Sequence, residues 1–207
     1  MKKFLVAIGC VLSYLFPKRI CLLIKSVFLY TYTGFYKNEF KSFGTGSVII
    51  PHIRLLVGAS NITIGNNCIL GKNIQLTAYE KYMTGQTFSP NIIIGDGVSI
   101  GDNSHITSID TIIIGNNVLT GKNILISDNA HGSSSSIDVN GSPISRSLTS
   151  KGAIKIGDNV WIGEKASILG GVSIGSGSII GANTVITKDV PDKTIAVGSP
   201  TRYIPII

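Results

Sequence analysis

Three histidines, His52, His105 and His131, carry side chains that could accept a proton near neutral pH. Such a base is needed when a hydroxyl group attacks an ester or thioester. His131 is expected at the sixth place of a six-residue repeat unit, which points away from the core, and a serine-rich insertion follows it directly. His105 takes the sixth place of another unit, on another face, and His52 lies beside Pro51. We therefore predict His131 as the base and the other two as surface or structural residues.

The histidines are placed by a six-residue repeat that starts near Phe43. Each unit has an aliphatic residue, usually a glycine, two polar turn residues and then a small or branched residue. Gly, Asn and Asp tolerate the positive φ of a tight corner, and strands this short must coil and pair in parallel to bury their aliphatic side chains. The pattern predicts an all-β fold, a parallel β-helix whose first and fifth side chains point inward. The aligned units begin at Ile64, Leu70, Ile94, Ile100, Ile114, Thr120, Ile126, Ile156, Ile162, Ile168, Ile174, Ile180 and Ile186.

Two stretches, residues 77–91 and 132–153, break the six-residue phase. We expect both to be loops that project from a repeat domain spanning residues 42–207. Insertions in solenoids tend to carry function because they leave the core intact. The second insertion follows His131, which favours that histidine further.

Residues 1–41 differ in composition from the repeats. They hold seven basic residues against Glu39 alone, in a chain with a formal net charge of +7. Two apolar runs, Phe4–Phe16 and Ile20–Tyr32, flank Pro17 and predict two short helices, each below the roughly 20 residues that span a bilayer. Residues 1–36 could lie in a membrane interface with their basic groups toward the headgroups, or pack on the end of the repeat domain.

The segment of residues 1–41 also indicates, through its composition, whether the protein binds nucleic acid and whether it carries a signal peptide. Its charge flanks apolar runs and is not interleaved with base-stacking aromatics in a polar groove, so we expect no nucleic-acid partner. The first run imitates a signal peptide, yet Phe16-Pro17-Lys18-Arg19 follows where a small-residue cleavage site is expected.

Cysteine and histidine usage points to the cytoplasm and away from a metal site. Cys10, Cys21 and Cys68 form neither a paired framework nor a CxxC spacing, which favours a reducing compartment. Two closely spaced histidines on one coil would be typical of a zinc site in such a fold, and the sequence has no such pair. We expect a cytoplasmic protein, at most peripheral on the inner face of the membrane, and no metal.

The repeat units resemble the hexapeptide-repeat acyltransferases. Residues 156–164, Ile-Gly-Asp-Asn-Val-Trp-Ile-Gly-Glu, with Lys151-Gly152 before them and Val197-Gly198-Ser199-Pro200 after them, are similar to the branch that acetylates bacterial surface polysaccharides. The resemblance implies triangular, left-handed coils of three units each. It also implies acetyl-CoA as co-substrate, bound in a groove between neighbouring subunits of a homotrimer.

The resemblance also implies roles for individual residues. Asp128-Asn129-Ala130-His131-Gly132 resembles the Asp-x-x-His-Gly segment that carries the family's catalytic histidine. Many members have a second histidine where Asn129 stands, so the partner that orients His131 stays open, with Asp128 as a candidate.

Five further positions are candidates for coenzyme A contacts. The only tryptophan, Trp161, faces outward and is expected beside the pantetheine arm or the acceptor, or at a subunit contact. Lys188 and Arg202 match family positions that contact the coenzyme A phosphates, although both could be ordinary surface charges. Gly181 and Ala182 would allow the cofactor close to the backbone, or serve only the coil corner.

The function implied is transfer of acetyl from acetyl-CoA to a sugar hydroxyl, directly in a ternary complex. The acceptor would be a sugar or lipid-linked saccharide of O-antigen, capsule or exopolysaccharide. Two alternatives remain at this point: N-acetylation of an amino-sugar nucleotide, and a non-catalytic β-helix scaffold.

Overall fold

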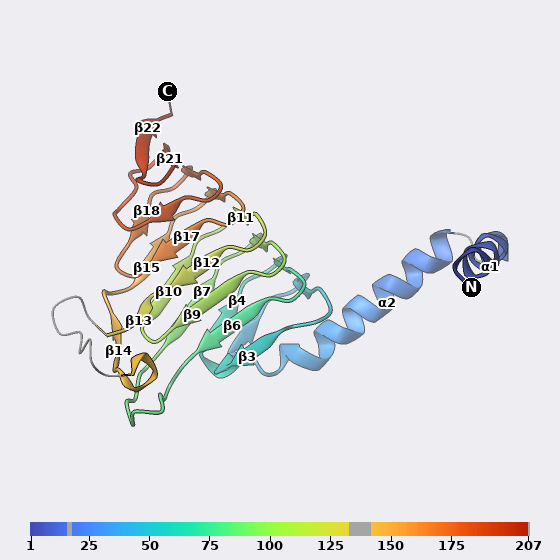
Figure 1. Cartoon of the computed structure of the whole chain (residues 1–207), viewed down its shortest axis with the longest axis horizontal. Coiled ribbons are helices and arrows are strands. Elements are labelled where there is room, and N and C mark those ends of the chain that lie inside the picture. Colours follow the sequence, from blue (N-terminus) through green and yellow to red (C-terminus); the bar gives the residue numbers. More distant parts are fainter. Residues whose placement is uncertain (16–17, 133–141, 207) are drawn as a thin grey trace.

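The computed structural model describes residues 1–15, 18–132 and 142–206. Residues from Ser42 onward wind into a stack of coils, and two helices, α1 (Lys2–Leu15) and α2 (Lys18–Lys37), project from its N-terminal end (Figure 1). The position between the helices at which the sequence places Pro17 lies outside the described residues.

In the described part of the chain, three sheets of short strands form the sides of the stack. The first holds β1 (Ser42–Phe43), β4 (Ile62–Ile64), β7 (Asn91–Ile94), β10 (Thr111–Ile114), β15 (Ile154–Ile156) and β18 (Ser173–Ile174). The second holds β2 (Val48–Ile49), β5 (Ile69–Leu70), β8 (Ser99–Ile100), β11 (Leu119–Thr120), β16 (Trp161–Ile162), β19 (Ile179–Ile180), β21 (Thr194–Val197) and β22 (Arg202–Pro205). The third holds β3 (Leu55–Val57), β6 (Gln75–Ala78), β9 (His105–Ser108), β12 (Leu125–Ser127), β17 (Ser167–Leu169) and β20 (Val185–Ile186).

Successive coils pair in parallel, and only β22 runs antiparallel to its neighbour β21 within these three sheets of the described chain. The register aligns equivalent repeat positions, as between Ile156 and Ile174, which are three units apart in the sequence. The predicted parallel β-helix is therefore confirmed.

The core is the stack of first and fifth repeat positions. Ile64, Leu70, Ile100 and Ile126 from first places are at most 1% exposed, and Cys68 from a fifth place is fully buried. This burial confirms the inward direction predicted for both places. It also explains why the units need a branched aliphatic at the first place, because that side chain packs on its equivalents in the coils above and below.

The corners depend on the fourth repeat position. Asn67, Asn103, Asn117 and Asn183 stand there with φ between 55° and 58°. Asparagine tolerates this left-handed conformation better than most residues, so the recurring Asn of the repeat is explained by backbone geometry.

The two insertions differ from the expected ranges. Thr77 and Ala78 extend β6, because they pair with Thr107 and Ser108 of β9, and Asn91 already belongs to β7. The first excursion is therefore residues 79–90, shorter than the expected 77–91.

The second excursion begins earlier than residue 132 and is not only a loop. The chain leaves the coil after Ser127 and forms the antiparallel pair β13 (Asn129–His131) and β14 (Leu148–Ser150), and β15 resumes the coil at Ile154. Short 3₁₀ turns occupy Ala59–Asn61 and Pro143–Ser145. Residues 133–141 of the expected loop lie outside the described residues.

Helix α2 contacts the coils only near its C-terminal end among the described residues. Thr33 Oγ1 accepts a hydrogen bond from the Ile49 amide at 3.0 Å, and the Tyr32 hydroxyl accepts one from the Ile53 amide at 2.8 Å. No single helix of the described chain is long and apolar enough to span a membrane. The two helical segments Lys2–Tyr14 and Lys18–Lys37, which are bent relative to each other, reach the required length and hydropathy only when taken together.

Candidate active site

The β13–β14 hairpin stands where strand β12 ends on the third sheet. The start of this hairpin is held in place by Asp128, which is only 2% exposed. The Asp128 carboxylate accepts hydrogen bonds from the Ser108 hydroxyl at 2.5 Å, the Ile109 amide at 2.9 Å and the Asp110 amide at 3.1 Å. These donors belong to the preceding coil, so Asp128 ties the base of the hairpin to the neighbouring turn.

Asp128 also lies close to the following coil, at the point where the chain leaves the stack. The Asp128 side chain bonds to the preceding coil, and the backbone carbonyl oxygen of Asp128 lies so close to Gly170 of the following coil that a Cβ there would approach it to 2.8 Å. His131 therefore does not occupy the expected sixth place of a coil unit. It lies on β13 and is exposed, on the hairpin that projects from the coils.

The structure places Tyr82, from the first excursion, against His131. The Tyr82 hydroxyl lies 3.3 Å from His131 Nδ1, and the two rings meet edge-on with centroids 5.6 Å apart. The same hydroxyl donates to the Ile144 carbonyl oxygen at 3.0 Å.

These two contacts define the tautomer of the imidazole. A tyrosine hydroxyl has one hydrogen, and the Ile144 carbonyl can only accept. The hydroxyl must then accept from His131, which requires the ring hydrogen on Nδ1. In the neutral ring, the lone pair then lies on Nε2, which is the arrangement that a general base needs.

A second residue of the first excursion braces the other strand of the hairpin. The Gln86 side chain donates to the Leu148 carbonyl oxygen at 3.1 Å and accepts from the Leu148 amide at 2.7 Å. The two excursions thus support each other. Repeat analysis missed Tyr82 and Gln86, since the only signal for them was that their segment breaks the phase.

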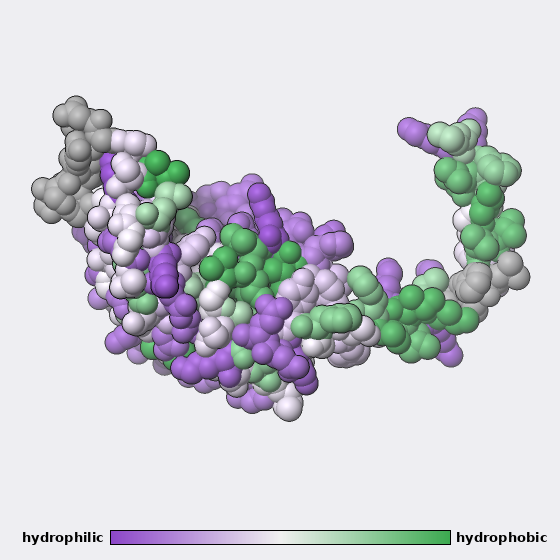
Figure 2. All heavy atoms as spheres, turned by 90° about the horizontal axis from the view of Figure 1, so that it is seen from below, coloured by the Kyte–Doolittle hydropathy of each residue, from purple (hydrophilic) through white to green (hydrophobic). Residues whose placement is uncertain are grey.

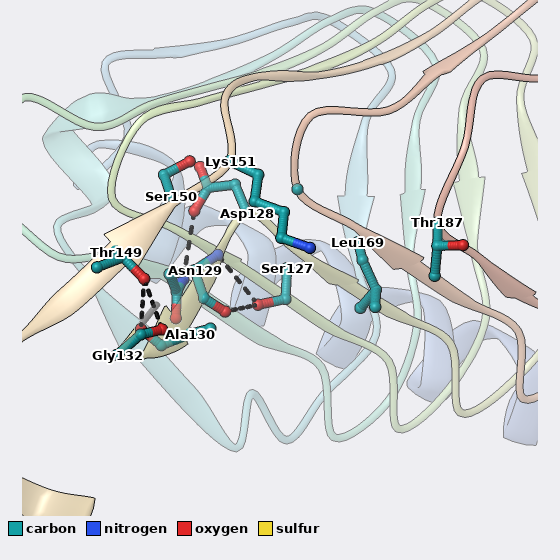
Figure 3. Close-up of a pocket in the computed structure, with 11 residues that line it drawn as sticks. Ser127, Asp128, Asn129, Ala130, Gly132, Thr149, Ser150, Lys151, Leu169 and Thr187 are labelled. Carbon is teal, nitrogen blue, oxygen red and sulfur yellow. Dashed lines mark hydrogen bonds between the residues drawn. The ribbon is translucent and has the colours of Figure 1, made fainter. Parts of the chain in front are cut away.

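A pocket of about 320 Å³ lies at the base of the hairpin (Figure 3). Both hairpin strands and the ends of β17 and β20 contribute to it, and Figure 3 shows the Lys151 side chain extending over the pocket in the direction of Leu169. His131 itself does not line the pocket, although Ala130 and Gly132 on either side of it do. The lining residues are Ser127, Asp128, Asn129, Ala130, Gly132, Thr149, Ser150, Lys151, Leu169, Gly170 and Thr187.

The other two histidines have different surroundings. His105 is half-buried on β9, with Nε2 at 3.4 Å from the Thr77 hydroxyl, and burial together with the Arg54 charge lowers its pKa. His52 is exposed and has a φ of 78°, so it serves as a corner residue of the first coil. The hydrogen bonds described for Asp128 join it to the preceding coil and to Asn129, and not to the imidazole of His131.

The expected coenzyme A residues lie on later coils. Trp161 is 50% exposed on β16 of the second sheet, outside the pocket lining. Gly181 approaches Val197, so a Cβ on Gly181 would lie 2.6 Å from a methyl carbon of that valine. Ala182 and Lys188 are exposed on turns, and Arg202 is exposed on β22 opposite Val197. Among the described residues, no group of three or more His, Cys, Asp or Glu is placed to hold a metal ion.

Comparison with known proteins identifies the class. The family described as "Bacterial transferase hexapeptide (six repeats)" matches residues 153–188. The chain is 33% identical over 148 residues to the putative lipopolysaccharide biosynthesis O-acetyl transferase WbbJ of Escherichia coli, covering 70% of this chain and 71% of that protein. It is 37% identical over 123 residues to the galactoside O-acetyltransferase of Escherichia coli, covering 57% of this chain and 55% of that protein. The chain belongs to the hexapeptide-repeat transferases and is an acyltransferase.

Solved structures share the fold. AntD, an N-acyltransferase from Bacillus cereus solved with dTDP and 3-hydroxybutyryl-CoA, aligns with a TM-score of 0.69 at 19% identity, covering 86% of this chain and 88% of that one. A maltose O-acetyltransferase from Clostridium difficile 630 aligns with a TM-score of 0.55 at 26% identity, covering 84% of this chain and 73% of that one.

Proposed function

We propose that this enzyme transfers an acetyl group from acetyl-CoA to a hydroxyl of a surface-polysaccharide sugar, with His131 Nε2 as general base. The observation that carries the proposal is the contact of His131 Nδ1 with a Tyr82 hydroxyl that donates to Ile144, which places the lone pair of the neutral ring on Nε2. The similarity to a lipopolysaccharide O-acetyl transferase supports a saccharide acceptor of O-antigen, capsule or exopolysaccharide. The site of action is the cytoplasm.

The transfer needs no covalent enzyme intermediate. Nε2 of His131 accepts the proton of the acceptor hydroxyl as its oxygen attacks the thioester carbonyl carbon. The carbon–sulfur bond then breaks, and the proton passes from Nε2–H to the departing thiolate. The products are the acetyl ester and the free thiol of coenzyme A.

The assembly belongs to the same proposal. We infer left-handed coils and a homotrimer, in which coenzyme A lies between the hairpin of one subunit and the C-terminal coils of the next. Trp161, Gly181 and Ala182 would border the pantetheine arm, and Lys188 and Arg202 the phosphates.

The direct test measures free thiol released from acetyl-CoA with candidate acceptors. Hydroxyl-bearing saccharides should give thiol and an acetyl ester that mild base removes. Release with amino-sugar nucleotides alone would overturn O-acetylation in favour of N-acetylation. Lack of release with every hydroxyl and amino acceptor would favour a scaffold and reject the enzyme.

Tyr82→Phe should lower kcat by about 5- to 30-fold, because loss of one positioning hydrogen bond is worth roughly 1–2 kcal/mol. The ring contact with His131 remains, and KM for acetyl-CoA should stay unchanged because no cofactor contact is lost. Steady-state kinetics measure both values. Tyr30→Phe, an exposed tyrosine on α2, is the matched control, and equal kcat for Tyr82→Phe and wild type would show that the hydroxyl does not position the base.

Lys188→Ala and Arg202→Ala should each raise the Kd of coenzyme A by about 5- to 50-fold, since each removes a charge-assisted contact to phosphate. The loss should be smaller for dephospho-CoA if the contact is to the 3′-phosphate. Calorimetry measures the four dissociation constants, with the exposed Lys155→Ala as control. An equal loss for both cofactors would contradict the assignment to that phosphate.

Arg202→Ala combined with His131→Ala tests whether neighbouring subunits share the groove. If each site combines His131 of one subunit with Arg202 of the next, trimers assembled from a mixture of His131→Ala and Arg202→Ala chains regain some intact sites. At acetyl-CoA concentrations far below saturation, activity of the mixture above either variant alone is expected, and no gain would place both residues on one subunit.

A further inference from the structure

The N-terminal arm, residues 1–15 and 18–31, exposes an apolar surface that nothing in the described chain covers. Figure 2 shows it as a hydrophobic projection from the coils. Exposed patches of this extent are rare on monomeric soluble proteins and mark interaction sites. The exposed apolar side chains include Phe4, Leu5, Val6, Ile8, Val11, Leu12, Ile20, Leu22, Leu23, Ile24, Val27 and Phe28.

The same arm is basic. It carries Lys2, Lys3, Lys18, Arg19 and Lys25, and the first acidic residue of the chain is Glu39. The arm therefore combines cations with exposed hydrocarbon, the two properties that bind a helix to an anionic lipid surface.

A second copy of the chain fits this arm less well. Phe4, Leu5 and Val6 are 69%, 59% and 66% exposed, and successive helix residues point about 100° apart. A partner helix covers one stripe, so much of this surface would stay in water. Pairing two arms would also bring like charges together.

The arm is firmly attached to the domain that it would anchor. The bonds from Ile49 to Thr33 and from Ile53 to Tyr32 hold the C-terminal end of α2 on the first coil. Contact of the arm with a surface would therefore fix the position of the coils near that surface.

We propose that the N-terminal arm binds the surface of an anionic lipid bilayer, with its apolar side chains in the interface and its basic groups among the headgroups. Lys18 and Arg19 begin α2 directly after the break, the part of the bent pair that would lie deepest in a bilayer, which favours the interface. This inference does not rest on the transfer chemistry, and its test reads binding alone.

The test is co-sedimentation of the full chain with vesicles of phosphatidylcholine, with and without phosphatidylglycerol. We expect binding to the anionic vesicles at about 0.05 M salt and much weaker binding at about 0.5 M, where the Debye length is shorter. Each basic residue near an anionic surface should change partitioning roughly fivefold. The triple substitution Lys2→Gln, Lys3→Gln and Lys25→Gln should then weaken binding about 100-fold.

Two further variants sharpen the result. The matched control, Lys72→Gln, Lys81→Gln and Lys155→Gln, removes the same charge from exposed sites outside the arm and should bind as wild type. Leu23→Glu with Val27→Glu removes apolar contact and should abolish binding at both salt concentrations. Equal weakening by both lysine triples, or failure of the wild type to pellet with anionic vesicles, would overturn the proposal. Larger oligomers formed without lipid would then assign the arm to a second copy of the chain.

Discussion

His131→Ala is expected to lower kcat by about 10²- to 10⁴-fold, because it removes the group that accepts the hydroxyl proton. The Kd of acetyl-CoA should change less than about threefold, since the imidazole acts on the acceptor and not on the cofactor. Single-turnover kinetics and equilibrium binding measure the two quantities separately.

Another histidine provides the control for this loss. His52→Asn keeps a residue type that tolerates the φ of 78° and should retain full turnover. The thermal midpoint of His131→Ala should match that of the wild type, because His131 is exposed. Near-normal turnover of His131→Ala would remove it as the base.

Asp128→Ala should reduce the free energy of unfolding by about 3–5 kcal/mol, because the buried Ile109 amide, the part-buried Asp110 amide and the Ser108 hydroxyl lose their acceptor. Thermal unfolding measures this change. Asp128→Asn keeps one acceptor oxygen and should cost roughly half as much.

Measuring both stability and turnover in these variants distinguishes a structural role of Asp128 from a role in orienting His131. Asp128→Ala should lower the thermal midpoint and the turnover together, since the base of the hairpin loosens. A variant of Asp128 with wild-type stability and strongly reduced turnover would instead show that the carboxylate orients His131 directly, as the sequence motif suggested.

The repeat could be predicted from the sequence in detail. First and fifth places are buried, and the asparagine corners have positive φ, because each unit meets the same local conditions and pairs with its own equivalent in the next coil. Periodicity and backbone conformation are local properties, so the sequence alone determined the coil and its inward residues. The acyltransferase class followed from the resemblance of the repeat units to a known family.

The insertions show what local properties could not decide. Only their existence was visible from the broken phase, and the expected bounds were wrong at both. The earlier departure at Asp128 follows from bonds to Ser108, Ile109 and Asp110, a full coil away in the sequence. Such contacts carry no periodic signal.

The position of the candidate base was likewise settled by tertiary structure. The sequence placed His131 beside an insertion and ranked it above His52 and His105. The tautomer of the neutral ring depends on Tyr82 and Ile144, which belong to two different insertions and meet because the coils bring those insertions together. The hydrogen-bonding state of a side chain depends on neighbours in space, and non-repeating segments give no rule by which the sequence could name those neighbours.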